Sequence, residues 1–396
     1  MRFQLQYSIL LIITLVFGSV HITGSAAVSY IVTCIAAILC FIEKVPYPHH
    51  RAITTYTVFI AIYSLNCIFY GYVLLLISSL VGFYFVSYIW IWATYILIKK
   101  YHSIKALLYT LLLVGFVNAV VTIGQRFMYP LALAIPEILQ KKGSEKMDLL
   151  INQIANEDYG FALWGIFDMV ANGYFSCVTA ILSVYICTRV PKIYSILLWA
   201  LSIVALFYTQ ERAALVSGVM FSILYFGLLF TKSKLSWKKS LFWAITPIFG
   251  VYLYDQLNIQ SIIEGSRYVS FEIGERSQIY EKSYEYLINH LFTANVYDFY
   301  FTTKLYPHNI VYNAFIYGTI IGGILILITL VSIIIKGLKI IKSSFERKVS
   351  NELLALTFAF MGYNVICLTH NASIVSGDLL FWLLATPVIF MYIPQK

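Results

Sequence analysis

The chain has 396 residues, of which 60% are hydrophobic and only 11% are charged. So few charged residues cannot cover the surface of a water-soluble domain, and the composition therefore excludes that class. The formal net charge of +9 comes mostly from lysines and arginines in chain ends and connections, so it indicates membrane topology and not nucleic-acid binding. We predict an all-α integral membrane protein in which residues 1–396 form a single polytopic domain.

Apolar runs long enough to cross a bilayer recur along the whole chain, since a spanning helix needs about 17–25 such residues. The stretch 54–98 is one continuous apolar block and too long for one helix, so we divide it near Tyr70–Gly71. About twelve transmembrane helices are predicted, at roughly 7–24, 27–42, 53–71, 73–98, 104–124, 168–188, 193–209, 213–231, 240–255, 310–335, 351–369 and 375–393.

The positions of the basic residues predict how these helices are oriented. Most of the 27 lysines and arginines fall in the termini or in short connections that share one side of the membrane. The positive-inside rule places that side, and both termini, in the cytoplasm. Two long loops then lie on the external side, at 125–167 and 256–309. Long loops on one face of a helical scaffold are common places for function.

The N-terminal apolar run has features of a secretory signal, with Arg2 before it and Gly24–Ala27 after it. We favour a retained first helix, because another apolar span follows at once, and cleavage is the alternative. The six cysteines lie within or at the edges of apolar spans without metal-binding spacing. Neither a metal site nor a disulfide framework is therefore expected.

The second external loop is predicted to contain a helix at 273–292. Arg276, Tyr280, Leu287 and Leu291 fall near one face at helical spacing. This pattern indicates an interfacial helix that lies along the membrane surface, with Arg276 near its start. The alternative is an ordinary amphipathic surface helix whose arginine is solvated.

Arg212 lies in an unusual connection between two apolar runs. The segment Thr209-Gln210-Glu211-Arg212 contains neither glycine nor proline, so the predicted turn is tight and its charge lies close to hydrocarbon. An ionisable residue in that position is costly and is a functional candidate. Glu211 is the neighbour expected to neutralise part of its charge. The alternative is an interfacial arginine that extends to the lipid headgroups.

His308 opens the tenth predicted span, between Pro307 and Asn309. Gly318 and Gly322 follow at small-xxx-small spacing, so this helix can pack closely against a neighbour. A histidine at the mouth of a helix can act as a general base, as a hydrogen-bond donor or as a simple interface residue.

Considered together, these residues suit a lipid-linked diphosphate. A planar guanidinium makes bidentate, charge-assisted bonds to phosphate oxygens, and Arg212 and Arg276 are both predicted to be external. A nearby histidine could accept a proton from an attacking hydroxyl or orient it. The sequence has no Asp-x-Asp pair for a metal-bound nucleotide sugar and no phosphate-binding glycine loop, so neither a metal nor a cofactor is expected.

These residues resemble those of the bacterial O-antigen polymerase and O-antigen ligase superfamily. Three blocks carry the resemblance, and a weaker fourth combines Gly165-Ile166-Phe167 with Asn172-Gly173. The three main blocks are Thr209-Gln210-Glu211-Arg212-Ala213-Ala214-Leu215, Gly274-Glu275-Arg276-Ser277-Gln278-Ile279-Tyr280 and His308-Asn309-Ile310-Val311-Tyr312-Asn313 with Gly318 and Gly322. The similarity covers roughly the second half of the chain.

The resemblance implies a metal-independent, inverting glycosyltransferase at the periplasmic face of the bacterial inner membrane. Its donor would be an oligosaccharide linked to undecaprenyl diphosphate. Arg212 and Arg276 would bind the diphosphate, and His308 would orient or deprotonate the acceptor hydroxyl. Glu211 and Asp168 are rivals for the role of base. The resemblance further implies that Asp168, Tyr280 and Asn309 contact donor or acceptor, and that a chain-length regulator and a flippase are partners.

The resemblance leaves two acceptors open. A polymerase transfers the growing glycan onto a new lipid-linked repeat unit, whereas a ligase transfers it onto lipid A-core. The ending from Thr369-His370-Asn371 through Ser376-Gly377-Asp378 to Phe381-Trp382 is more similar to polymerases, which we therefore favour. A flippase or transporter predicts mid-span charges and internal repeats, which the sequence lacks. A non-catalytic scaffold would leave Arg212 without a role.

Overall fold

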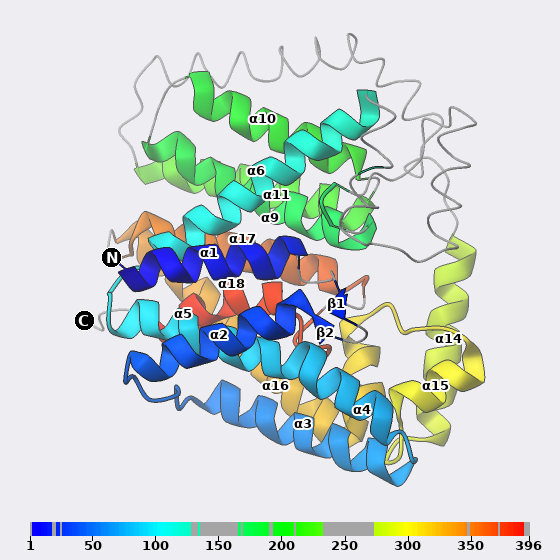
Figure 1. The fold of residues 1–396 in the computed structure, drawn as a ribbon. Helices are drawn as coiled ribbons and strands as arrows, with labels where there is room; N and C mark the ends of the chain where they lie inside the picture. Colours follow the sequence, from blue (N-terminus) through cyan, green and yellow to red (C-terminus); the bar gives the residue numbers. More distant parts are fainter. Residues whose placement is uncertain are drawn as a thin grey trace. The chain divides into compact units, whose positions relative to one another are not determined.

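A computed structural model shows a chain built almost entirely of helices (Figure 1). The residues that the structure describes are 2–17, 21–23, 26–127, 134, 165–167, 169–189, 193–209, 211–232, 273–346, 349–370 and 373–391. They divide into two compact units. Unit 1 consists of Met1–Val114 and Glu272–Lys396, and unit 2 consists of Gly115–Phe271.

Unit 1 is a helical bundle with one short antiparallel strand pair, in which His21 pairs with Ala27. Its elements are α1 (Arg2–Phe17), β1 (His21–Thr23), β2 (Ala26–Ala27), α2 (Val28–Ile42), α3 (Arg51–Phe69), α4 (Val73–Ser79), the π-helix η1 (Leu80–Phe85), α5 (Val86–Lys99), α14 (Ile273–Asn289), α15 (Val296–Thr303), α16 (Ile310–Phe345), α17 (Asn351–Cys367) and α18 (Leu379–Phe390). Helix α6 (Lys105–Phe127) begins in unit 1 and continues into unit 2, which also contains α9 (Met169–Arg189), α10 (Ile193–Tyr208) and α11 (Arg212–Lys232).

The core of unit 1 lies where α5, α16, α17 and α18 meet. Helix α18 packs against α5, α16 and α17, and the long helix α16 also packs along α3. The aromatic side chains of Trp90, Trp382, Phe360 and Phe381 are fully buried there. In unit 2, α9 packs against both α10 and α11.

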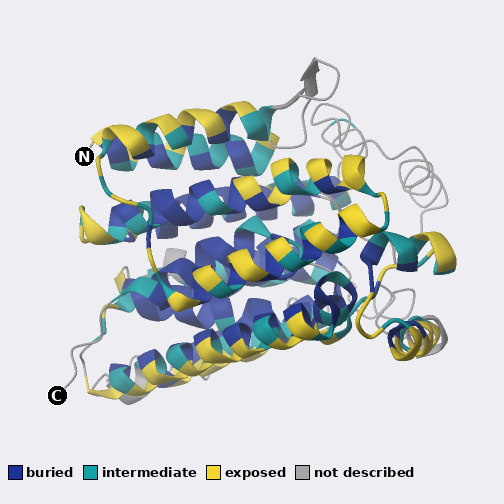
Figure 2. Cartoon of the chain, turned by 90° about the horizontal axis from the view of Figure 1, so that it is seen from below, coloured by how far each residue is buried: buried dark blue, intermediate teal, exposed yellow. Residues whose placement is uncertain are grey.

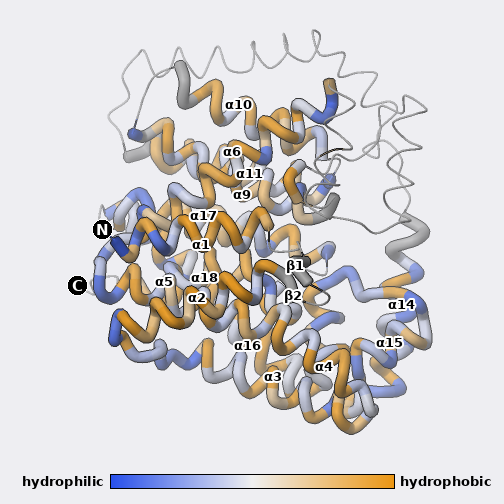
Figure 3. Tube along the Cα trace, in the orientation of Figure 1, coloured by the Kyte–Doolittle hydropathy of each residue, from blue (hydrophilic) through white to orange (hydrophobic). Residues whose placement is uncertain are grey.

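The predicted spans agree with the described helices. The span predicted at 240–255 lies outside the described residues, and each of the others overlaps a described helix. Among the described residues, five helical stretches are long and apolar enough to cross a membrane, at Arg51–Phe69, Val73–Lys99, Lys105–Phe127, Arg212–Leu229 and Ile310–Phe345. Figure 3 shows hydrophobic residues along the length of α2, α3 and α16, whereas α14 is mixed.

Large apolar side chains are exposed on the outward sides of the helices, where Figure 2 shows exposed residues. Leu74 is 83% exposed and Phe69 is 79% exposed. Soluble monomers rarely expose large contiguous apolar surfaces. Helices of this length with this exposed apolar surface are those of a membrane protein.

The connections of unit 1 gather at two ends. At one end, the Glu43 carboxylate accepts hydrogen bonds from Lys100 (2.7 Å) and Tyr101 (2.8 Å), and the Phe3 ring stacks on Tyr101. The start of α1 and the α2–α3 and α5–α6 connections therefore meet, together with their lysines. At the other end, the Asn66 side chain donates to the Ala294 carbonyl, so the end of α3 meets the start of α15.

Several helix starts in unit 1 are fixed by capping side chains, which accept hydrogen bonds from backbone N–H groups that have no partner within the helix. Asn295 caps α15, Asn309 caps α16, Ser350 caps α17 and Asp378 caps α18. Helix α3 ends at Phe69, close to the division predicted near Tyr70–Gly71. Gly71 follows with a φ of 76°, in the region that glycine tolerates best.

Helix α14 confirms the predicted loop helix but is shorter than expected. It ends at Asn289, so Leu291 does not share a helical face with Arg276 and Tyr280 as predicted. The chain leaves the helix because the N–H of Thr293 donates to the His290 carbonyl in a turn. The carbonyl of Leu291 instead accepts a hydrogen bond from the N–H of Ile320.

Helix α16 is broken near its beginning. Thr319 has φ 55° and ψ −171°, so Ile310–Gly318 and Ile320–Phe345 are two helical segments. The predicted close packing at the glycines is confirmed, because a Cβ at Gly318 would lie 2.5 Å from the Phe59 ring. The Ile320 N–H, freed by the break, donates to the Leu291 carbonyl. A break in a spanning helix is tolerated when such a partner is present.

Candidate functional site

His308 lies at the junction of α16 and α17. The next residue, Asn309, caps α16 by accepting a hydrogen bond from the Val311 N–H (2.8 Å). Its amide nitrogen also donates to the Leu368 carbonyl at the end of α17 (2.9 Å). One side chain therefore fixes both the start of α16 and its distance from α17, and it holds the backbone next to His308 in place.

Tyr280 links α14 to the same junction. Its hydroxyl donates to the His308 carbonyl (3.4 Å), and its ring stacks on Tyr312 with centroids 5.8 Å apart. Arg276 precedes Tyr280 by one helical turn on α14, and its side chain lies outside the described residues. The structure thus brings together the predicted residues Tyr280, His308 and Asn309.

The sequence analysis did not select His370 as a site residue. The rings of His370 and His308 lie in an edge-to-face arrangement, with centroids 6.4 Å apart and an interplanar angle of 83°. His370 is 6% exposed and belongs to the α17–α18 connection, the segment whose sequence favoured a polymerase. The only sequence signal for its position was that segment's similarity to polymerases.

The described part of the α17–α18 connection that follows residue 372 begins with a buried stretch. Ser373, Ile374 and Val375 have no exposed surface. The Tyr84 hydroxyl of η1 donates to the Val375 carbonyl (2.8 Å), and Ser87 of α5 donates to the Gly377 carbonyl. Non-helical backbone at membrane depth is tolerated where protein covers it, and these bonds satisfy two of its carbonyls.

Arg212 is the first residue of α11, and Glu211 immediately precedes it. Glu211 is only 8% exposed, and its carbonyl accepts the hydrogen bond from the Leu215 N–H that closes the first turn. Arg212 is partly buried. The positive end of the helix dipole and the guanidinium therefore coincide, and both favour an anion at this point.

A buried polar network supports this turn from α6 and α9. The Asn118 amide donates to the Asn172 side chain (2.6 Å) and accepts from the Ile166 N–H (3.0 Å). Gly173, next to Asn172, lies against the Glu211 side chain, since a Cβ there would be 2.7 Å from the Glu211 Cγ. The weak sequence block at 165–173 is therefore a packing site for Glu211.

The predicted residues form two groups. Tyr280, His308 and Asn309 belong to unit 1, and Glu211 and Arg212 belong to unit 2. Within each group the structure places the residues close together. Asp168 lies outside the described residues. Among the residues that the structure describes, no three His, Cys, Asp or Glu side chains lie together in a way that could hold a metal ion.

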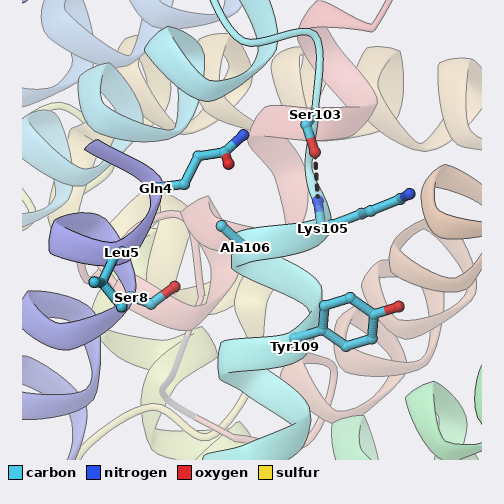
Figure 4. Close-up of a pocket in the computed structure, with 7 residues that line it drawn as sticks. All are labelled: Gln4, Leu5, Ser8, Ser103, Lys105, Ala106 and Tyr109. Atoms are coloured by element: carbon cyan, nitrogen blue, oxygen red, sulfur yellow. Dashed lines mark hydrogen bonds between the residues drawn. The ribbon is translucent and has the colours of Figure 1, made fainter. Parts of the chain in front are cut away.

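A groove of about 340 Å³ lies between the starts of α1 and α6 and contains none of these residues (Figure 4). Gln4, Ser8 and Lys105 line it, and the Ser103 hydroxyl accepts a hydrogen bond from the Lys105 N–H. It lies at the lysine-bearing end of unit 1. The candidate residues around His308 lie at the other end.

The sequence matches no known family model, no curated protein and no solved structure.

Proposed function

We propose that this chain is a surface-polysaccharide polymerase of the O-antigen polymerase type. It transfers a growing glycan from undecaprenyl diphosphate onto a new lipid-linked repeat unit. In this proposal the chain crosses the bacterial inner membrane about twelve times, with both termini in the cytoplasm. The lysine-bearing end of unit 1 is cytoplasmic, and the end with His308 is periplasmic.

The observation that carries the proposal is the contact between Tyr280 and His308. It joins the second and third sequence blocks of the resemblance, which lie on α14 and α16. Arg276 lies one turn before Tyr280, near the start of α14, which is the helix that contacts His308 through Tyr280. Helices α14 and α16 are in contact, and a cation, a tyrosine hydroxyl and an imidazole lie on them or directly before them. A cation suits the binding of a diphosphate, and an imidazole suits the orientation or deprotonation of an attacking hydroxyl.

Arg212 supports the same chemistry from unit 2. Arg212 lies at the start of α11, where the positive end of the helix dipole adds to the charge of its guanidinium. These two positive contributions suit the two negative charges of a diphosphate. The burial of Glu211 beside it, against Gly173, fixes the turn that presents the arginine.

The proposed reaction is a single displacement. The acceptor hydroxyl oxygen attacks the anomeric carbon of the donor sugar as the bond from that carbon to the diphosphate oxygen breaks. The lipid diphosphate leaves with the electron pair, and Arg212 and Arg276 stabilise its developing charge. His308 takes the hydroxyl proton or orients the hydroxyl. One displacement inverts the anomeric centre, and the leaving diphosphate requires neither metal nor cofactor.

The test is a lipopolysaccharide gel of the source strain without this gene, complemented by wild type, Arg212→Ala, Arg276→Ala or His308→Ala. We expect the deletion to leave core with a single repeat unit. Wild type should restore the ladder, whereas the three variants should not, at normal protein abundance. Bare core with long polymer on the lipid carrier would instead indicate a ligase. An unchanged ladder would refute both for O-antigen.

A further inference from the structure

Two buried asparagines, Asn313 in α16 and Asn364 in α17, each lie one helical turn from a contact between these helices. Asn309 is bonded to the Leu368 carbonyl, which sets the register of the two helices. Helix α16 runs away from this contact and α17 runs towards it, so Asn313 and Asn364 are each one helical turn deeper. They are 2% and 8% exposed.

Each asparagine has one polar atom without a hydrogen-bond partner among the described residues. For Asn313 this atom is the donor Nδ2, and for Asn364 it is the acceptor Oδ1. The other half of the Asn364 amide is used, because Nδ2 donates to the Phe360 carbonyl (2.8 Å). A buried polar group without a partner destabilises the fold, so its presence points to a ligand that completes it.

Asn118 shows that the chain partners its buried amides elsewhere. Its nitrogen donates to Asn172 and Ser176, and its oxygen accepts from the Ile166 N–H. The amides of Asn313 and Asn364 differ in being incomplete.

We propose that Asn313 and Asn364 form a subsite for a hydroxyl group of the acceptor sugar. A hydroxyl both accepts and donates, so it can accept from Asn313 Nδ2 and donate to Asn364 Oδ1. This inference rests on the proposed function, because it places the acceptor sugar next to His308. Asn313 lies on the segment Ile310–Gly318, which the break at Thr319 separates from the rest of α16. The proposed subsite requires that segment to move away from α17 for the sugar to enter.

The test compares Asn313→Leu and Asn364→Leu with the matched control Asn118→Leu. Each protein is purified and reconstituted in liposomes. Its thermal midpoint is measured, and its elongation rate is measured against the concentration of lipid-linked repeat units extracted from the deletion strain. Leucine has nearly the shape of asparagine but forms no hydrogen bond. The control should lower the midpoint, because it breaks three bonds.

We expect Asn313→Leu to keep or raise the midpoint, because its unpartnered Nδ2 has no bond to lose. Asn364→Leu loses only the bond to the Phe360 carbonyl, so it should lower the midpoint less than the control does. We also expect each to raise the KM for the repeat unit about fivefold, the equivalent of one neutral hydrogen bond. A midpoint lowered as in the control would overturn the subsite, because the amides would then be structural. An unchanged KM would overturn it as well. Wild type without elongation activity would refute the proposed function itself, and the subsite with it.

Discussion

Thr319 carries backbone strain at the break in α16. Its φ of 55° with ψ of −171° is a conformation found almost only in glycine, and its β-branched side chain makes the conformation less favourable still. Such residues cost about 1–3 kcal/mol each. We predict that replacing Thr319 with glycine relieves this strain, whereas replacing it with alanine retains it.

The comparison of glycine with alanine isolates the strain, because both substitutions remove the same hydroxyl and methyl groups. At an ordinary helical position glycine is less stable than alanine by about 1 kcal/mol. Thr329, also in α16 and 4% exposed, is such a position. At Thr319 the strain offsets or exceeds the glycine penalty. The glycine variant should therefore be as stable as the alanine variant, or more stable by up to about 2 kcal/mol.

The assay is reversible unfolding of Thr319→Gly, Thr319→Ala, Thr329→Gly and Thr329→Ala in the same mixed micelles. The glycine-minus-alanine difference at residue 319 should exceed that at residue 329 by about 1–3 kcal/mol. Two equal differences would show that Thr319 is not strained and that α16 is continuous.

Two further predictions concern a glycine and a carboxylate. Gly165→Ala should destabilise the protein strongly, because φ is +59° and the added Cβ would lie 2.1 Å from Asn118 Oδ1. Gly227→Ala, which meets no atom within 4 Å, should be neutral or slightly stabilising in the same melting experiment. Burial alone would raise the pKa of the Glu43 carboxyl, but hydrogen bonds and the charge of Lys100 lower it below its usual value. The Glu43 interaction therefore stabilises the fold at neutral pH and is lost as the pH falls through that lowered pKa. We expect acidification to lower the melting temperature of wild type more steeply than that of Glu43→Gln. Equal decreases in the two proteins would contradict this prediction.

Hydrophobic periodicity and charge predicted the helices well but not their irregularities. The apolar runs located α3 and α11 within a few residues, because burial in lipid requires a continuous apolar surface. The end of α14 and the break in α16 could not be predicted, because they depend on each other. The Leu291 carbonyl leaves one helix to bond the Ile320 N–H that the other leaves free. That pairing joins residues distant in sequence and has no local pattern.

The candidate site was predictable where a polar residue interrupts an apolar pattern. His308 and Asn309 were conspicuous in this way, and the structure joins them to Tyr280. Asn313 and Asn364 carry the same signal, a polar amide inside a spanning helix, and it could have been used. The proximity of His370 to His308 could not be predicted from the sequence, because it depends on how the α17–α18 connection folds back into the bundle.

Three costly features of unit 1 coincide at one segment, and their coincidence argues for function. Ile310–Gly318 ends at a strained residue, carries an incomplete amide at Asn313, and begins beside a buried non-helical connection. Each feature lowers stability, and none is needed for a helix to cross a membrane. Local conflicts of this kind persist at sites where activity requires them. If the segment were only structural, removing these costs by Thr319→Gly and Asn313→Leu would stabilise the protein without affecting glycan elongation. We expect Asn313→Leu instead to separate the two properties, with stability kept and elongation impaired.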